Sequence, residues 1–226
     1  MSEKDFIVTA TGSELPEFER PTYVVALPSK KLLDNPKVKS AIAKLAPLVH
    51  AGEPEIKFTE VDPEKLKSGK TEITCMDARE FSNASRKKLA GNNFITFAGS
   101  AFFAHPEIAQ KLRDAGHDDL VEALQAILDA AREADMSIDI ISNHFGEDGG
   151  CGGLNFIKNS CGGLEIPDAK MYKKLLEETR TAIGEIAQDA EIALYQTGAD
   201  GQVIARFNLE DPEDMAAFTK VYDGKF

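Results

Sequence analysis

The sequence predicts an α/β protein with a central sheet whose core strands run parallel and are flanked by helices. Short β-branched segments alternate along the chain with longer helical segments, the order that produces parallel strands joined by crossover helices. Residues 137–142 (SIDIIS) are almost continuously apolar, which is typical of a strand buried on both faces. The 226-residue length fits one domain with a sizeable core, and 42% hydrophobic residues indicate a folded protein.

The periodicity of apolar residues predicts where the strands and helices lie. β-rich segments predict strands, and apolar residues three or four positions apart predict helices. The expected strands span residues 22–27, 55–59, 71–76, 93–98 and 137–142, and the expected helices span residues 36–49, 106–134 (with an interruption at Gly116) and 168–188. Residues 191–207 predict a C-terminal β-hairpin that turns around Gly198–Gly201. We expect residues 1–20 to form an extended N-terminal arm and residues 21–226 to form a single α/β domain.

Composition and charge argue against several classes of protein. The formal net charge is −12, and no basic cluster offsets the repulsion from phosphate groups, so we expect no nucleic-acid partner. The longest apolar segments are too short to cross a membrane, so we expect no membrane partner. The first residues lack the layout of a secretory signal, and the expected localisation is cytoplasmic. Three cysteines in a chain of this size indicate reduced thiols that are available to a metal.

The first group of chemically useful side chains is Cys75, Asp77 and Arg79, at the end of the strand expected over residues 71–76. Side chains alternate between the two faces of an extended chain, so these three project to the same side. A guanidinium beside a carboxylate keeps the carboxylate ionised and holds its orientation. The alternative is an ordinary salt bridge beside a buried thiol, and the motif alone does not decide between the two.

The second group is His144 and Cys151, separated by a glycine-rich loop that follows the buried strand at residues 137–142. A helix that begins near Cys151 would favour the thiolate form of this cysteine. Glycines on both sides of Cys151 let the backbone approach a bound ion closely. Cys161 is followed by the same Gly-Gly-Leu sequence, and it is the competing cysteine.

Together, the two groups predict a metal site made by Cys75, His144 and a later cysteine, with Cys151 preferred. Both groups lie at the C-terminal ends of expected strands, where open α/β sheets bind their ligands. Thiolate and imidazole ligands select zinc, and cadmium also fits them. Three protein ligands leave a fourth position open, as in catalytic zinc sites, whereas the addition of Cys161 would give a closed Cys3His site.

These residues resemble the metal site of the β-class carbonic anhydrase family. That family carries C-x-D-x-R after one strand and H-x-x-C followed by glycine after another. Cys75, Asp77 and Arg79 match the first motif. His144 and Cys151-Gly152-Gly153 match the second, with six residues between histidine and cysteine instead of two, and longer spacings of this kind occur in carboxysomal and ζ-class relatives. The resemblance covers roughly residues 70–165 and includes Ala98-Gly99 of a third family segment.

The resemblance implies a β-carbonic-anhydrase-like fold and a zinc-dependent carbonic anhydrase, a lyase that hydrates carbon dioxide reversibly to bicarbonate. It assigns Cys75, His144 and Cys151 as zinc ligands, and Asp77 as acceptor of a hydrogen bond from the zinc-bound hydroxide, with Arg79 holding Asp77. Residues 21–226 are then one zinc-binding catalytic domain with a small-molecule substrate. Because the β-class usually builds its sheet and site across a dimer, the resemblance also implies a homodimer or higher homo-oligomer.

Two other functions remain open from the sequence. The same scaffold and the same zinc chemistry serve a carbonyl sulfide or carbon disulfide hydrolase, and a saturated Cys3His site would make a non-catalytic zinc-binding module. By the resemblance, Asp77 can also displace the water and ligate zinc once its pair with Arg79 is broken. His50, His105 and His117 are candidate proton shuttles by residue type alone, since histidine titrates near neutral pH.

Overall fold

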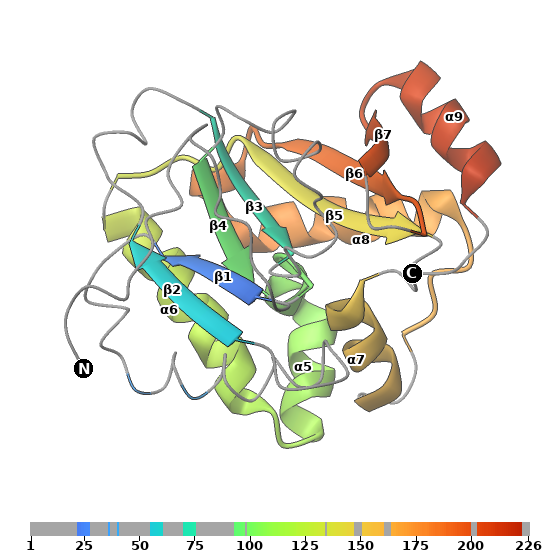
Figure 1. The fold of residues 1–226 in the computed structure, drawn as a ribbon. Coiled ribbons are helices and arrows are strands. Elements are labelled where there is room, and N and C mark those ends of the chain that lie inside the picture. Colours follow the sequence, from blue (N-terminus) through green and yellow to red (C-terminus); the bar gives the residue numbers. More distant parts are fainter. Residues whose placement is uncertain are drawn as a thin grey trace.

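The computed structural model describes residues 22–27, 55–60, 70–75, 93–97, 99–133, 135–146, 151–160, 164–199 and 203–222, and positions 36 and 40. These residues form a mixed α/β structure in which helices flank an open, mostly parallel sheet, as the sequence predicts (Figure 1). The arm expected at residues 1–20 lies outside the described residues. Of the helix expected at residues 36–49, the structure describes only Pro36 and Ser40, and both are helical.

The main sheet has five strands in the order β4-β3-β5-β6-β7. The strands are β4 (Asn93–Phe97), β3 (Thr71–Cys75), β5 (Ile140–Gly146), β6 (Glu191–Thr197) and β7 (Val203–Asn208). The first four run parallel, and β7 returns antiparallel to β6, which confirms the predicted C-terminal hairpin. A second, two-stranded parallel sheet of β1 (Thr22–Leu27) and β2 (Glu55–Glu60) lies beside β4.

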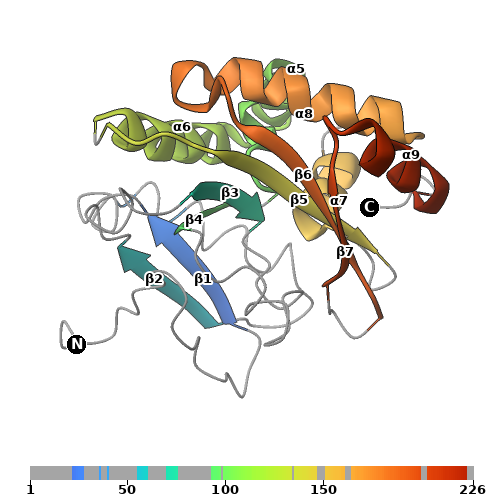
Figure 2. The same ribbon diagram turned by 90° about the horizontal axis from the view of Figure 1, so that it is seen from above.

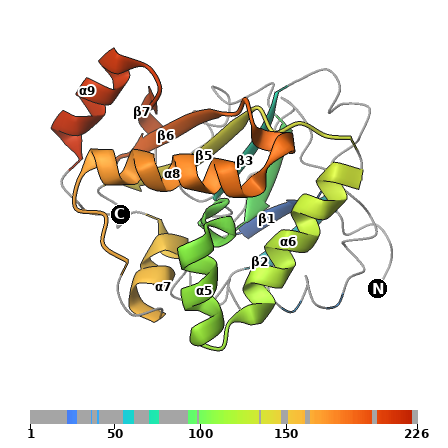
Figure 3. The same cartoon turned by 180° about the vertical axis from the view of Figure 1, so that it is seen from behind.

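Three of the described helices cover one face of the main sheet, as Figures 2 and 3 show. They are α5 (Pro106–Asp114), α6 (Asp118–Glu133) and α8 (Ala169–Ile183). Short 3-10 turns precede α5 at Phe102–Ala104 (η2) and follow α8 at Glu185–Ala187 (η3). Helix α7 (Gly152–Ser160) lies near the ends of the strands, and α9 (Pro212–Val221) packs beside β7. Helix α9 is absent from the sequence prediction, although Asp211 caps it and Pro212 opens its first turn.

The two faces of the main sheet carry different kinds of side chain. Because side chains alternate along a strand, Ile73, Ile141 and Leu194 share one face, and they belong to the same buried apolar core as the helices. The opposite face is more polar. It carries Glu72, Ser142, His144 and Tyr195, all of which are buried. Buried polar chemistry is therefore concentrated on the face that α5, α6 and α8 do not cover.

Aromatic side chains anchor the C-terminal half of β5 to the elements that follow it. The ring of Phe145 contacts the rings of Phe207, Phe218 and Tyr222, with centroids between 5.2 and 6.2 Å apart. The Tyr222 hydroxyl donates a hydrogen bond to the Ile166 carbonyl at 2.8 Å. Burial of each such ring contributes about 1.5–3 kcal/mol. Phe145 is thus fixed in the core directly beside His144, and this holds the end of β5 in place.

Strand β5 differs from its predicted position. The sequence places it at residues 137–142, with His144 beyond its end, whereas it spans Ile140–Gly146 and includes His144. The polar residues that suggested an end to the strand are buried with partners. Ser142 donates to the Glu72 carboxylate, and the Asn143 amide donates to the Gly99 carbonyl. Since these polar groups are satisfied, the strand continues through them and pairs with β6 along its whole length.

Gly146 of β5 leaves no room for a side chain beside Thr197 of β6, and its replacement tests this arrangement. A Cβ atom at Gly146 would lie 2.1 Å from the Thr197 carbonyl oxygen. We expect Gly146→Ala to lower the free energy of unfolding, measured by urea denaturation, by about 2–3 kcal/mol, because the added atom forces the two strands apart.

Gly116→Ala is the matched control for this substitution. Gly116 has a φ of +79°, but nothing lies within 4 Å of a Cβ atom there, so backbone strain alone should cost about 1 kcal/mol. Equal losses in the two variants would contradict the close approach of Gly146 to β6.

Candidate metal centre

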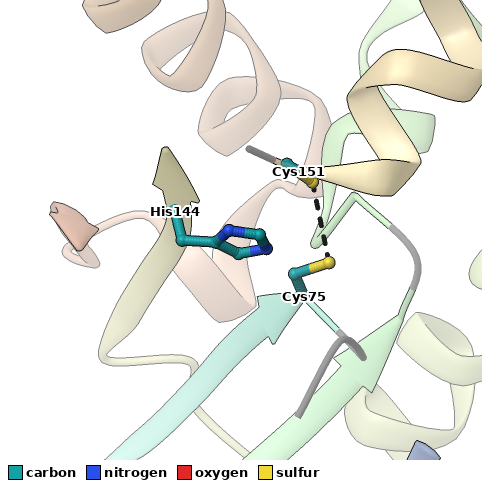
Figure 4. A group of neighbouring side chains, drawn as sticks. All are labelled: Cys75, His144 and Cys151. Atoms are coloured by element: carbon teal, nitrogen blue, oxygen red, sulfur yellow. Dashed lines mark hydrogen bonds between the residues drawn. The ribbon is translucent and has the colours of Figure 1, made fainter. Parts of the chain in front are cut away.

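The structure brings Cys75, His144 and Cys151 together at the C-terminal ends of β3 and β5 (Figure 4). One potential ligand atom of each residue lies within 4.8 Å of the others, and all three side chains are buried. The two sulfur atoms are 3.6 Å apart. A disulfide bond would hold them about 2.05 Å apart, so the two cysteines are not joined in one.

Cys75 and His144 converge because β3 ends earlier than β5. By alternation, Cys75 lies on the helix-covered face with Ile73, whereas His144 lies on the opposite face with Ser142. The register pairs Ile73 with Ile141, which places Cys75 level with residue 143 and His144 one position beyond. The imidazole can therefore reach across the end of β3, and Figure 4 shows its ring directed toward the two sulfur atoms.

Cys151 occupies the position immediately before α7. The Asn155 N–H donates to the Cys151 carbonyl at 2.9 Å, which is the first hydrogen bond of the helix. A helix does begin near Cys151, at Gly152, which is the condition under which the sequence favours a thiolate there. The N–H groups of a first helical turn and the helix dipole stabilise a negative charge, so this position favours a thiolate.

The turn after β4 contacts each of the three elements that carry these residues. Gly99 and Ser100 both have positive φ angles, +68° and +59°. The Ser100 hydroxyl donates to the Ile73 carbonyl on β3 at 3.1 Å, and the Asn143 amide on β5 donates to the Gly99 carbonyl at 3.5 Å. A Cβ atom on Gly99 would lie 3.4 Å from the carbonyl carbon of Gly153 in α7, so little space separates the turn from that helix.

The arrangement of the three side chains fits a tetrahedral metal ion. Zinc binds a thiolate sulfur at about 2.3 Å, so two thiolates on a tetrahedral zinc ion lie about 3.8 Å apart. The observed sulfur–sulfur distance of 3.6 Å is close to this value. Two thiolates also balance the charge of a divalent cation, which buried sites require. The group of Cys75, His144 and Cys151 can therefore hold a metal ion.

Other residues predicted for the site lie outside the described part of the chain. Asp77 and Arg79 follow β3 closely, and Cys161 directly follows α7. Among the candidate ligands that the structure does describe, Cys151, the preferred third cysteine, joins the group.

Two of the three candidate proton shuttles, His105 and His117, are described by the structure, and both contact residues outside the metal group. His50 lies outside the described residues. The buried Nε2 atom of His105 lies 3.0 Å from the Glu178 carboxylate, and this hydrogen bond lowers the pKa of Glu178. The ring of His117 packs against Phe156 of α7, with centroids 5.2 Å apart. Neither His105 nor His117 belongs to the group that can hold the metal.

A buried carboxylate near this group was not predicted from the sequence. Glu72 of β3 is fully buried, and its carboxylate accepts hydrogen bonds from the Ser142 hydroxyl and, at 3.4 Å, from the Tyr195 hydroxyl. Burial and the charge of Glu72 raise the pKa of Tyr195, so its hydroxyl keeps the proton that it donates. The available signal was an acidic residue inside the strand TEITC, since carboxylates are rarely buried without partners.

No family model matches the chain, and neither a curated protein nor a solved structure matches it. Among the described helices, none has the length and apolar character needed to cross a membrane.

Removal of any one of the three ligands should abolish metal binding. We expect the wild-type protein to bind about one zinc ion per chain, as open three-ligand sites do. Cys75→Ala, His144→Ala and Cys151→Ala should each bind less than about a tenth of this amount, because two ligands hold zinc weakly. Equilibrium dialysis followed by elemental analysis measures the stoichiometry.

Cys161→Ala is the matched control, since Cys161 is followed by the same Gly-Gly-Leu sequence as Cys151. This variant should retain the wild-type stoichiometry. Metal loss in Cys161→Ala with retention in Cys151→Ala would move the third ligand to Cys161, and retention in Cys75→Ala would contradict the site.

Proposed function

We propose that this protein is a zinc-dependent carbonic anhydrase with a β-class type of site, which hydrates carbon dioxide reversibly to bicarbonate. The observation that carries the proposal is the convergence of Cys75, His144 and Cys151 at the C-terminal ends of parallel strands. The β-class motif assigns these same positions to the metal, and Asp77 and Arg79 follow Cys75 at the spacing of that motif.

The donor set supports zinc as the metal. Two soft thiolates and an imidazole favour zinc over magnesium, calcium or manganese, which prefer oxygen ligands, and cadmium fits the same donors. Zinc held by three protein ligands lowers the pKa of a water molecule in its remaining position toward about 7, and this supplies a nucleophile at neutral pH.

The residues of the chain would then hold and orient the reacting groups. Two thiolates weaken the Lewis acidity of the metal relative to three imidazoles, so a neighbouring residue has to orient the nucleophile. Asp77 is the residue in the motif that would accept a hydrogen bond from the nucleophile, and Arg79 would hold the Asp77 carboxylate in a charge-assisted pair. The start of α7 stabilises the thiolate of Cys151.

The position of the candidate ligands in the fold also supports the proposal. Open, mostly parallel sheets place their ligands at the C-terminal ends of strands, and here two of the three candidate ligands lie on adjacent parallel strands. The burial of all three side chains excludes bulk water from the ligand side of the group, which strengthens electrostatic interactions with a bound ion.

Stopped-flow measurement of carbon dioxide hydration across pH 6–9, with metal content determined on the same sample, tests this function. We expect kcat/KM of the zinc-loaded protein to rise with pH through about 7, because the deprotonated form of the bound water is the reactive one. A zinc-loaded wild-type protein that hydrates carbon dioxide no faster than buffer would overturn the proposal.

Substitution of Asp77 separates catalysis from metal binding. We expect Asp77→Ala to retain about one zinc ion per chain and to lose at least about 100-fold in kcat/KM, as general proton-transfer and orienting groups do when removed. Asp189→Ala, an exposed aspartate after η3, is the control and should keep wild-type activity. Wild-type activity in Asp77→Ala would show that the Asp77–Arg79 pair has only a structural role.

A further inference from the structure

We propose that Glu72 is a positioning residue for the metal group, which ties β3 to β5 beside the group and adds a buried negative charge that strengthens cation binding. The inference rests on the proposed metal binding by Cys75, His144 and Cys151. It concerns a residue outside the motif that suggested the function, and it follows from the contacts of Glu72 with β5 and β6.

The backbone pairing between β3 and β5 is short. Within the described residues, their backbone register consists of Glu72 with Ile140 and Ile73 with Ile141, whereas β5 and β6 pair over seven positions. The metal group bridges this same seam, with Cys75 on β3 and His144 on β5. Backbone pairing alone therefore fixes the relative position of the two ligand strands less firmly than that of β5 and β6.

A hydrogen bond between side chains also joins β3 to β5. The Ser142 hydroxyl on β5 donates to the Glu72 carboxylate on β3. Ser142 precedes His144 by two residues and shares its face, and Glu72 precedes Cys75 by three residues. This hydrogen bond thus joins the two ligand strands between the backbone pairing and the metal group, and it limits how far Cys75 and His144 can separate.

Glu72 also contacts β6, through Tyr195. Tyr195 is in register with His144, and register partners on parallel strands share a face of the sheet. The Tyr195 hydroxyl donates a hydrogen bond to the second carboxylate oxygen of Glu72, at 3.4 Å. The tyrosine side chain therefore extends from the level of His144 toward the level of Glu72, so the Glu72 carboxylate on β3 is linked both to the histidine strand β5 and to β6.

The outer end of this set of contacts reaches the edge of the sheet. The Arg206 guanidinium of β7 lies 5.9 Å from the centre of the Tyr195 ring, and it forms an ion pair of 2.5 Å with Glu191. Burial lowers the pKa of Arg206, but its contacts with Tyr195 and Glu191 outweigh burial and raise it. Glu133, an exposed glutamate at the end of α6, lies outside this set of contacts and has the same side-chain type as Glu72, which makes it the matched control.

The carboxylate of Glu72 is fully buried. A buried carboxylate is costly, and replacement of buried polar groups by packed apolar ones is often neutral or stabilising. Ile140 of β5, the register partner of Glu72 on the same face, is buried and apolar, which shows that this face accepts apolar residues. A carboxylate that is hydrogen-bonded to the histidine strand two residues before His144 is useful where a cation has to be held, because opposite charges interact strongly in a buried site.

Glu72→Gln tests the role of the charge, since it preserves the size of the side chain and one hydrogen-bond acceptor. We expect chelator competition to show zinc affinity lowered about 10–100-fold, the range typical of residues that support metal ligands. The visible absorption spectrum of the cobalt-substituted protein should also change, because the position of His144 changes. Glu133→Gln should leave both the zinc affinity and the cobalt spectrum as in the wild type.

Tyr195→Phe provides a second test that does not depend on the stability of Glu72→Gln. It leaves the carboxylate in place and removes one of its hydrogen-bond donors, so zinc affinity should fall several-fold and the cobalt spectrum should shift. If Glu72→Gln folds and keeps the wild-type zinc affinity and cobalt spectrum, the role of Glu72 is overturned. If Glu72→Gln does not fold, the same result in Tyr195→Phe overturns it. Absence of zinc binding by the wild-type protein would instead overturn the metal site itself, so the two failures are distinguishable.

Discussion

The short pairing between β3 and β5 is the constraint on which the metal group depends. Strict alternation places Cys75 and His144 on opposite faces of the sheet, where a continuous ladder would keep them apart. The register between these strands extends only to Ile73 and Ile141 among the described residues, and β3 ends at Cys75. Because β5 continues, the imidazole can cross the end of β3 and meet a thiol from the other face. The site therefore exists where regular sheet structure stops.

Metal binding and local structure are coupled at such a position. Two sulfur atoms 3.6 Å apart repel one another when both thiols are ionised. A divalent cation removes this repulsion and joins β3, β5 and the start of α7. Because the thiols must lose their protons to bind, the affinity for the metal depends on pH, and part of the binding free energy stabilises the fold around it. The turn at Gly99–Ser100, which follows β4, contacts the same three elements.

Local patterns in the sequence predicted most of the strands and helices, whereas contacts between distant residues determined the bounds of β5. The β-branched segments at residues 22–27 and 71–75 form strands within one residue of their predicted bounds, and the rule that ligands lie at strand ends brought Cys75 and His144 into one hypothesis. The position of β5 was wrong because Ser142 and Asn143 look like the end of a strand until Glu72 and Gly99 satisfy them. Those partners lie 70 and 44 residues away, beyond the reach of any local pattern.

The long spacing between His144 and Cys151 has a physical explanation in the same strand. The motif that the chain resembles separates histidine and cysteine by two residues, whereas six separate them here. Strand β5 runs two residues past His144, through Phe145, which is anchored among aromatic rings, to Gly146, which abuts Thr197. Two extended residues carry the chain about 7 Å beyond the histidine. Four residues, 147–150, then separate Gly146 from Cys151, which lies beside Cys75 at the start of α7. The longer spacing therefore accompanies the extension of β5 past His144, and the three residues of the metal group still come together.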